Sequence, residues 1–362
     1  MAKVIVFVTM SLWDEPHRGR HHYANLLSDR NTVIWINRHL RPGEQDVRPG
    51  IQHIKNGLYV LHAGKPLLPT RLDNRLNINN RFRLRLLRRE LARLNIKSPD
   101  VVWCYDHKGA PFVRAYGGRA VCLYFCNDWF GNWTSYPRHE KTLASIVDHV
   151  FAVSPKLCAR FEPLNRNTHF VPHGLWLPDA TPVYSKKPRP ETVGYVGTLN
   201  NTVDTDLLEK IINETECDLL LAGPIVEASP PKRAAFQRLI NHPRVKYLGD
   251  LGKREADHAR SLVDVLLLPY VKNIVREYGF PIKYFEYLGA GKPILSTDYM
   301  TWPDPFCDTM HVFREQDDLR TCIAQAYQRW NEDCFNNAMA LARKSTWECR
   351  VATISELIGV AL

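Results

Sequence analysis

Short apolar runs separated by helical patterns recur along the first half of the chain. They are rich in valine, isoleucine and aromatic residues, as buried strands are, and lie at residues 4–8, 33–36, 101–105, 121–125 and 150–153. Strands that alternate with helices predict an α/β unit built on a parallel sheet. The run at 4–8 is too short to span a membrane, and no small-residue cleavage site follows it, so we expect it to be the first strand.

A second series of apolar runs begins after a proline-rich stretch. Residues 178–191 contain four prolines and two adjacent lysines, which is a linker composition. Beyond it, strands are predicted at 193–196, 219–222, 245–248, 263–268 and 294–296. With 362 residues the chain is long enough for two cores. We therefore expect two α/β domains, residues 1–180 and 191–345, followed by a final helical segment at 346–362.

Residues 279–293, which read G-F-P-I-K-Y-F-E-Y-L-G-A-G-K-P, predict a short helix with two different faces. Pro281 suits the first helical position, and the glycines at 289 and 291 can end the helix. The helical period then predicts a packing face with Ile282, Phe285 and Leu288. It predicts a ligand-facing side with Lys283, Glu286 and Tyr287.

The ligand-facing side of this helix has the chemistry that a nucleoside diphosphate requires. Free backbone N–H groups at a helix start favour a phosphate, and Lys283 adds a full positive charge. Glu286 can accept hydrogen bonds from ribose hydroxyls. The alternative is an exposed helical ion pair between Lys283 and Glu286, worth roughly 0.2–0.5 kcal/mol.

Loop-forming residues follow the predicted strands of the second half. Ligands in parallel sheets bind beyond the carboxyl ends of the strands, so these residues predict one wall of a cleft. The candidates for this wall are Gly197, Thr198, Gly223, Gly249 and Tyr270. Each glycine taken alone is equally compatible with an ordinary tight turn.

The run P-I-K-Y-F-E-Y-L-G-A-G-K-P resembles a motif of the GT-B glycosyltransferases, specifically the group 1, family 4-like set that builds bacterial polysaccharides. In that set the motif's glutamate contacts the donor ribose, and nearby basic residues contact the pyrophosphate. The resemblance implies that Glu286 contacts the donor ribose and that Lys283 and Arg276 contact the pyrophosphate. It also implies that Pro281 and Ile282 belong to the donor-binding site. It also implies two Rossmann-like domains facing an interdomain cleft, with the donor on the C-terminal domain and a final helix crossing back to the first.

The chain departs from the family pattern in two places. Members carry two glutamates eight positions apart, whereas Glu277 precedes Glu286 by nine and Tyr278 holds the expected place. The turn at 197–199 is also not followed by the lysine that many members have. Lys283, Arg276 or Lys272 is expected to supply the missing charge.

Acceptor chemistry is expected from the first half of the chain. Inversion at the sugar carbon needs a base at hydrogen-bond reach of the acceptor hydroxyl, and Asp128, just after the run at 121–125, is our candidate. The alternative for Asp128 is a turn-forming aspartate. A retaining reaction would need no dedicated base, so the stereochemistry stays open. Further acceptor-side candidates are His21, His22, Asp106 and His107.

Positive charge gathers in one amphipathic segment, residues 71–97. The chain has a net charge of +10, and eight arginines in this segment alternate with leucines at helical spacing, at 84, 87, 91 and 94. Such a helix can lie on an anionic bilayer, with about 1 kcal/mol per cation near the surface. The alternative is a Rossmann helix with its leucines on the sheet and its arginines in water.

Composition narrows the cellular context. The nine cysteines form no C-x-x-C pair, so reduced thiols, a cytoplasmic location and no zinc site are expected. The protein would be peripheral at the inner face of the plasma membrane if the basic segment binds lipid.

These patterns predict a metal-independent hexosyltransferase with a nucleoside-diphosphate sugar as co-substrate and no other cofactor. Its acceptor would be a cell-envelope or exopolysaccharide glycan, or a lipid-linked precursor. Two alternatives are a sugar-nucleotide epimerase of related fold and a basic nucleic-acid-binding protein. The epimerase should carry its own carboxylates and histidine around the donor, a set that the sequence does not supply. The nucleic-acid reading leaves the 279–293 motif unexplained.

Overall fold

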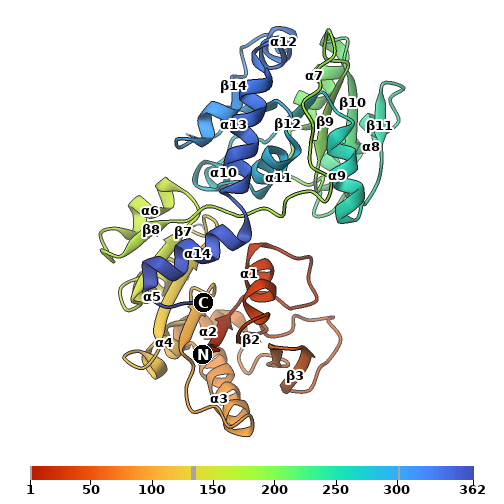
Figure 1. Ribbon diagram of the computed structural model, residues 1–362. Coiled ribbons are helices and arrows are strands. Elements are labelled where there is room, and N and C mark those ends of the chain that lie inside the picture. Colours follow the sequence, from red (N-terminus) through yellow and green to blue (C-terminus); the bar gives the residue numbers. More distant parts are fainter. Residues whose placement is uncertain (1, 132–135, 301) are drawn as a thin grey trace. The chain divides into compact units, whose positions relative to one another are not determined.

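The computed structural model describes residues 2–131, 136–300 and 302–362. The chain divides into two compact units, which are Met1–Pro172 with Trp347–Leu362 and His173–Thr346. In Figure 1 the blue helix α14 (Trp347–Ile358) accordingly lies among the red-to-yellow elements of unit 1, where it contacts α1 (Gly19–Ser28). Residues 176–191 form neither helix nor strand.

Unit 1 is built on an eight-stranded sheet with the order β3-β4-β2-β1-β5-β6-β7-β8. All neighbouring strands are parallel except β3 and β4, which pair antiparallel. Its strands are β1 (Val4–Val8), β2 (Thr32–Ile36), β3 (Gly50–Lys55), β4 (Leu58–His62), β5 (Val101–Cys104), β6 (Val121–Cys126), β7 (His149–Ala152) and β8 (Thr168–Phe170). Its other helices are α2 (Thr70–Leu76), α3 (Ile78–Arg93), α4 (Ala110–Tyr116), α5 (Tyr136–Ala144) and α6 (Pro155–Phe161).

Aromatic side chains on adjacent strands form the centre of the unit 1 core. Phe7 is in register with Trp35 and Trp103, and its ring centroid lies 6.2 and 5.1 Å from theirs. Tyr23 of α1 covers this row, with its ring 5.3 Å from Trp103 and 5.1 Å from Trp347 of α14. Helix α14 is therefore a structural part of unit 1. The apolar runs that the sequence showed in the first half of the chain are the buried strands of this unit.

Unit 2 has a six-stranded, all-parallel sheet with the order β11-β10-β9-β12-β13-β14. The strands are β9 (Thr192–Val196), β10 (Asp218–Ala222), β11 (Val245–Tyr247), β12 (Val265–Leu268), β13 (Ile294–Thr297) and β14 (Met310–Phe313). The helices are α7 (Thr205–Glu214), α8 (Pro230–Ile240), α9 (Lys253–Ser261), α10 (Ile274–Tyr278), α11 (Ile282–Ala290), α12 (Leu319–Arg329) and α13 (Glu332–Arg343), with the short helix η1 (Phe306–Thr309).

Four strands, β3, β4, β8 and β14, escaped prediction. The interior strand β4 has an apolar run that the prediction overlooked, whereas the other three lie at sheet edges and lack such a run. Strand β3 alternates polar residues at an exposed edge, and it pairs only with β4. Strands β8 and β14 are also edge strands and are short and half-buried. Edge strands bury less of each face, so their sequences carry a weaker apolar signal.

The basic segment 71–97 is not one helix with an outward leucine stripe. The chain breaks at Asn77, whose φ of 52° is left-handed, and α2 and α3 lie on either side of it. Leu84, Leu87 and Leu91 of α3 are 8%, 0% and 3% exposed. These leucines pack inside unit 1, which corrects the expectation that they could lie on a bilayer. Across the described residues, no helix combines the length and the apolar character needed to cross a membrane.

Candidate functional site

The candidate site of unit 2 lies at the carboxyl edge of its sheet. From β9 the chain runs through β10 to β11 on one side and then returns to β12 on the other. The loops after β9 and β12 therefore diverge at a topological switch point, where parallel sheets bind ligands. Gly197 directly follows β9, and Tyr270 lies two residues after β12.

Gly197 packs closely against the Lys283 side chain. A Cβ atom at this position would lie 2.5 Å from Cε of Lys283. Gly223, which follows β10 with φ of +125°, lies directly against it, because a Cβ there would be 2.2 Å from the Gly197 carbonyl oxygen. Gly249 continues the edge, since its carbonyl oxygen accepts a hydrogen bond of 2.6 Å from the Gly223 N–H. Gly197 thus leaves room for the Lys283 side chain, and Gly223 allows the two loop backbones to approach closely.

Lys283 and Glu286 lie together on α11 and join a buried arginine of α9, Arg260, with its half-buried partner Asp257. Lys283 Nζ is 2.7 Å from Glu286 Oε2, and Arg260 Nη1 is 3.3 Å from the same oxygen. Arg260 also pairs with Asp257, and its side chain is 7% exposed. Glu286 keeps 29% of its side chain exposed. The carboxylate is thus held from below by a guanidinium while its outer side stays accessible.

Arg276 and Tyr270 lie close to this cluster. Arg276 donates a hydrogen bond of 2.9 Å to Thr202 Oγ1, and its guanidinium carbon lies 4.6 Å from the centroid of the Tyr270 ring. Burial raises the pKa of Tyr270, Arg276 opposes this shift, and Glu286 adds to it. Both charged groups are therefore near the Tyr270 phenol. The structure brings together Gly197, Tyr270, Arg276, Lys283 and Glu286.

Two details of α11 differ from the sequence prediction. Pro281, with ψ of 131°, is the residue before the helix and not its first residue, and Ile282 begins α11 half-buried. Tyr287 does not share the ligand-facing side, because it is 0% exposed and its hydroxyl accepts a hydrogen bond of 2.9 Å from the Val196 N–H. It fixes α11 to the end of β9, close to Thr198, whose carbonyl oxygen binds the Tyr195 hydroxyl.

Arg260 is the member of this cluster that sequence reasoning missed. It lies in the last turn of α9 within the run H-A-R-S, where a charged residue is normally solvated. Its burial arises from packing between α9 and α11, which are distant in sequence. Asp257, three residues before it, indicated a local ion pair, but that spacing is common on exposed helices and does not indicate burial.

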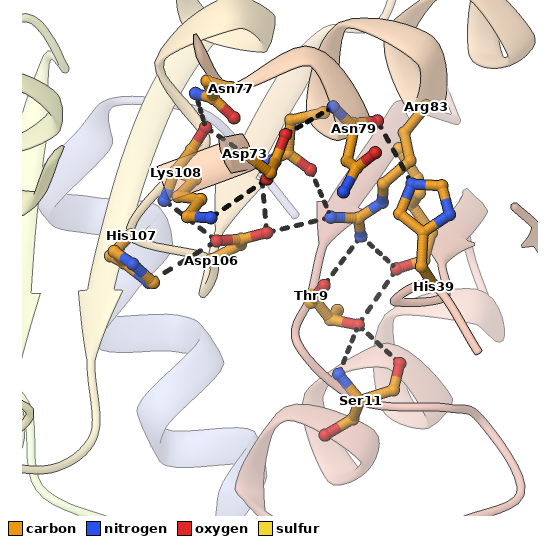
Figure 2. Close-up of polar contacts among 12 residues, drawn as sticks. Thr9, Ser11, His39, Asp73, Asn77, Asn79, Arg83, Asp106, His107 and Lys108 are labelled. Atoms are coloured by element: carbon orange, nitrogen blue, oxygen red, sulfur yellow. Dashed lines mark hydrogen bonds and ion pairs between the residues drawn. The ribbon is translucent and has the colours of Figure 1, made fainter. Parts of the chain in front are cut away.

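In unit 1, a buried arginine gathers the ends of three parallel strands (Figure 2). Arg83 of α3 donates hydrogen bonds of 2.7 and 3.0 Å to the carbonyl oxygens of Thr9 and Ile36, at the ends of β1 and β2. It also lies 2.9 Å from Asp106 Oδ2, just beyond β5, and its side chain is 2% exposed. Arg83 therefore satisfies the Thr9 carbonyl and shares the Ile36 carbonyl with the Thr9 hydroxyl, which donates to it at 3.0 Å.

Asp106 and His107, predicted on the acceptor side, lie within or against this network. Asp106 accepts further hydrogen bonds from Asn80 Nδ2 at 3.1 Å and from the Lys108 N–H at 2.9 Å. Burial would raise its pKa, but Arg83 and these bonds outweigh burial and lower it. Burial lowers the pKa of His107 to about 4. These contacts hold α3 on the strand ends, and the acceptor roles of both residues stay predictions.

The other acceptor-side candidates are placed in unit 1 as follows. His21 is 0% exposed, and its two ring nitrogens bond the Arg18 N–H at 3.1 Å and the Leu12 carbonyl at 3.3 Å. His22 is half-buried, with its ring 5.0 Å from Trp347. Asp128, after β6, is half-buried and accepts a hydrogen bond of 2.9 Å from the Trp129 N–H. That bond is a local contact with the next residue, and the role of Asp128 as a base stays a prediction.

Unit 1 is expected to lose stability as the pH falls from about 6.5 towards 4. Burial lowers the pKa of His21 to about 3 and that of His107 to about 4, from 6.5. Above pH 6.5 both histidines are neutral in the folded and in the unfolded protein. Below pH 6.5 only the unfolded chain takes up the protons, so the free energy of unfolding falls by about 1.4 kcal/mol per pH unit for each histidine. Thermal unfolding between pH 7.5 and 5 should therefore be less pH-dependent in His107→Gln than in wild type or in the exposed control His258→Gln. An unchanged slope in His107→Gln would contradict this linkage.

Two sequence comparisons bear on the second half of the chain. Residues 190–330 match the family model of the glycosyl transferases group 1. A putative teichuronic acid biosynthesis glycosyltransferase, TuaH of Bacillus subtilis, is 24% identical over 173 residues, which are 46% of this chain and 43% of the relative. The chain thus matches less than half the length of that curated relative.

Solved structures resemble the whole chain. Sucrose-phosphate synthase from Thermosynechococcus elongatus has a TM-score of 0.71 at 15% identity, with 98% of each chain covered. The Anabaena protein HepE, solved in complex with UDP, has a TM-score of 0.68 at 12% identity, covering 99% of this chain and all of the other. These likenesses show the GT-B fold with its two Rossmann-like units, as the sequence predicted.

Proposed function

We propose that this chain, whose residues 190–330 match the family model of the group 1 glycosyltransferases, moves a sugar from a nucleoside diphosphate to a cell-envelope glycan. The observation that carries the proposal is the cluster at the switch point of unit 2. There Lys283 lies in the space left by Gly197, and Glu286 is braced by Arg260. A cation beside an accessible carboxylate, at the carboxyl edge of a parallel sheet, suits a diphosphate followed by a ribose.

Each residue of the cluster would have a separate task. Lys283, with Arg276 nearby, would neutralise the diphosphate as its bond to the anomeric carbon breaks. Glu286 would accept hydrogen bonds from the ribose hydroxyls through its exposed side. Arg260 would not touch the donor but would hold the carboxylate in place. Such preorganised charges act without the cost of reorienting water.

The acceptor hydroxyl would supply the new bond to the anomeric carbon. In an inverting reaction its proton would pass to Asp128, and in a retaining reaction it would pass to the departing diphosphate, so that no dedicated base is needed. The relative's name refers to teichuronic acid biosynthesis, which supports an acceptor in an envelope polysaccharide. The proposal involves no metal and no cofactor besides the nucleotide sugar.

A thermal-shift panel of UDP, GDP, dTDP, ADP and CMP tests the donor assignment. A ligand that binds only the folded state raises the melting temperature, because it increases the free energy of unfolding. The increase is about 2.7 kcal/mol when the ligand concentration is a hundred times the dissociation constant. We expect one diphosphate to raise it selectively and CMP to have little effect, because CMP lacks the second phosphate. No shift with any nucleotide would overturn the proposal.

A further inference from the structure

Helix α2 of unit 1 turns its polar side towards the protein and its leucines towards solvent. Its acidic residue, Asp73, is 4% exposed and accepts hydrogen bonds of 2.7 Å from the Asn79 N–H and 3.0 Å from Lys108 Nζ. Figure 2 shows Asp73 and Asn77 pointing towards Lys108, beyond the end of β5. The polar side of α2 thus faces the protein, the reverse of an ordinary surface helix.

The opposite side of α2 exposes leucines to solvent. Leu72 and Leu76 lie four residues apart, hence on one face, and are 53% and 52% exposed. Leu67, just before the helix, is 54% exposed. We call these three residues the α2 patch. Single exposed leucines are common, but three in ten residues, on a helix fixed by buried polar bonds, form a built apolar surface.

The exposed charges of α2 itself are positive, whereas Lys65 before it is paired with the exposed Asp46. Arg71 and Arg75 flank the leucines on α2 and are exposed, and Lys65 precedes them with 69% of its side chain exposed, 2.9 Å from Asp46. Asp73, the one acid within residues 65–76, is bound on the buried side. A partner for this surface must therefore be apolar with a negative periphery.

We propose that the α2 patch docks on an anionic lipid bilayer, with Leu67, Leu72 and Leu76 entering the interface and Arg71 and Arg75 contacting lipid phosphates. Basic residues beside apolar ones are what such a surface recognises. A second copy of this chain is a poorer fit, because it would bring the same cations to the contact in a protein of net charge +10. The inference rests on the proposed function only in that a lipid-linked acceptor would lie in the same membrane.

The docking surface lies at the start of the predicted basic segment 71–97, and not along the leucines at 84, 87 and 91. The leucines of α3 pack inside unit 1, and the left-handed residue Asn77 gives α2 a separate direction. Membrane binding should therefore depend on α2 and not on the exposed arginines of α3, such as Arg81 and Arg85. This difference makes the two surfaces separable by mutation.

Vesicle co-sedimentation tests the proposal on the full chain. Wild type should bind vesicles of equal phosphatidylglycerol and phosphatidylcholine, bind pure phosphatidylcholine weakly, and lose binding as salt is raised. Leu72→Gln with Leu76→Gln should raise the lipid concentration for half-binding about tenfold or more, because less apolar surface enters the interface. Both positions are exposed and glutamine is a good helix former, so the fold should be retained.

Two control variants sharpen the outcome. Val183→Gln with Leu357→Gln removes exposed apolar surface elsewhere, and Arg81→Glu with Arg85→Glu reverses exposed charges on α3. The first control should bind vesicles like wild type, and the second should lose less binding than the α2 variant.

Three outcomes would overturn the proposal. One is equal vesicle binding by wild type and the Leu72/Leu76 variant, and another is a greater loss in the α3 variant than in the α2 variant. The third is a dimer of the wild type in sedimentation velocity that the Leu72/Leu76 variant abolishes, with no vesicle binding by either. The donor site is judged separately, because the Leu72/Leu76 variant should keep the nucleotide response of wild type. Loss of that response in wild type itself would reject the proposed function and leave the vesicle result standing.

Discussion

Replacing Glu286 by alanine is expected to weaken nucleoside diphosphate binding roughly 10- to 100-fold, because hydrogen bonds to a charged acceptor contribute about 1.5–3 kcal/mol. The loss should fall on the nucleoside and not on the phosphates. Removing the carboxylate leaves Lys283 and Arg260 without their shared partner, which lies 2.7 and 3.3 Å away. Affinity for inorganic pyrophosphate should therefore be kept or increased. Isothermal titration with both ligands measures the two effects.

The matched control for this experiment is Glu214→Ala, an exposed glutamate at the end of α7 in the same unit. It removes the same charge from unit 2 without touching the cluster, so it should bind both ligands like wild type. Equal losses for the nucleotide and for pyrophosphate in Glu286→Ala would show that Glu286 only maintains the fold of the site. Unchanged affinity for both would remove it from the site.

Replacing Arg83 by leucine is expected to lower the free energy of unfolding of unit 1 by about 3–5 kcal/mol. The substitution removes the ion-pair partner of Asp106, which is only 6% exposed. It also removes the Arg83 donor that lies 2.7 and 3.0 Å from the carbonyl oxygens of Thr9 and Ile36. Hydrogen exchange read by mass spectrometry should show the loss in unit 1 peptides, while unit 2 peptides keep their protection.

A double-mutant cycle separates the ion pair from the strand-end bonds. Asp106→Leu alone leaves Arg83 charged and buried, whereas Arg83→Leu with Asp106→Leu removes both charges. The double variant should be less destabilised than the sum of the single variants, by about 1–3 kcal/mol. Additive losses would show that Arg83 acts through the backbone carbonyls and not through Asp106.

Sequence reasoning was most effective where burial leaves a periodic signal. The central strands of both sheets lie where their apolar runs predicted them, and α11 carries Lys283 and Glu286 on its accessible side as the helical period required. Gly291, with φ of 63°, ends this helix as glycine does when a left-handed residue is needed. These features depend on local spacing, which one chain displays.

Sequence reasoning failed where a residue's environment is set by distant parts of the chain. In the sequence, Arg83 and Arg260 look like solvated charges. In the structure both are buried, and their guanidinium groups bind strand-end carbonyls or acidic side chains. Tyr287 looks amphipathic, but its hydroxyl binds the backbone of β9. Helix α2 has an ordinary mixture of leucine and arginine, and only the position of Asp73 against Lys108 shows which side faces inward.

The position of α14 also constrains the order in which the protein can mature during synthesis. Unit 1 comprises residues 1–172 and 347–362, so all of unit 2 is translated before the helix that packs on Tyr23 through Trp347 exists. Unit 2 is continuous in sequence and can complete its core while the ribosome is still at work. The unit whose strands are made first is then the last to close, and until residue 358 has emerged its aromatic row lacks part of its cover. Chaperones that recognise exposed apolar surface would meet nascent unit 1 throughout that interval.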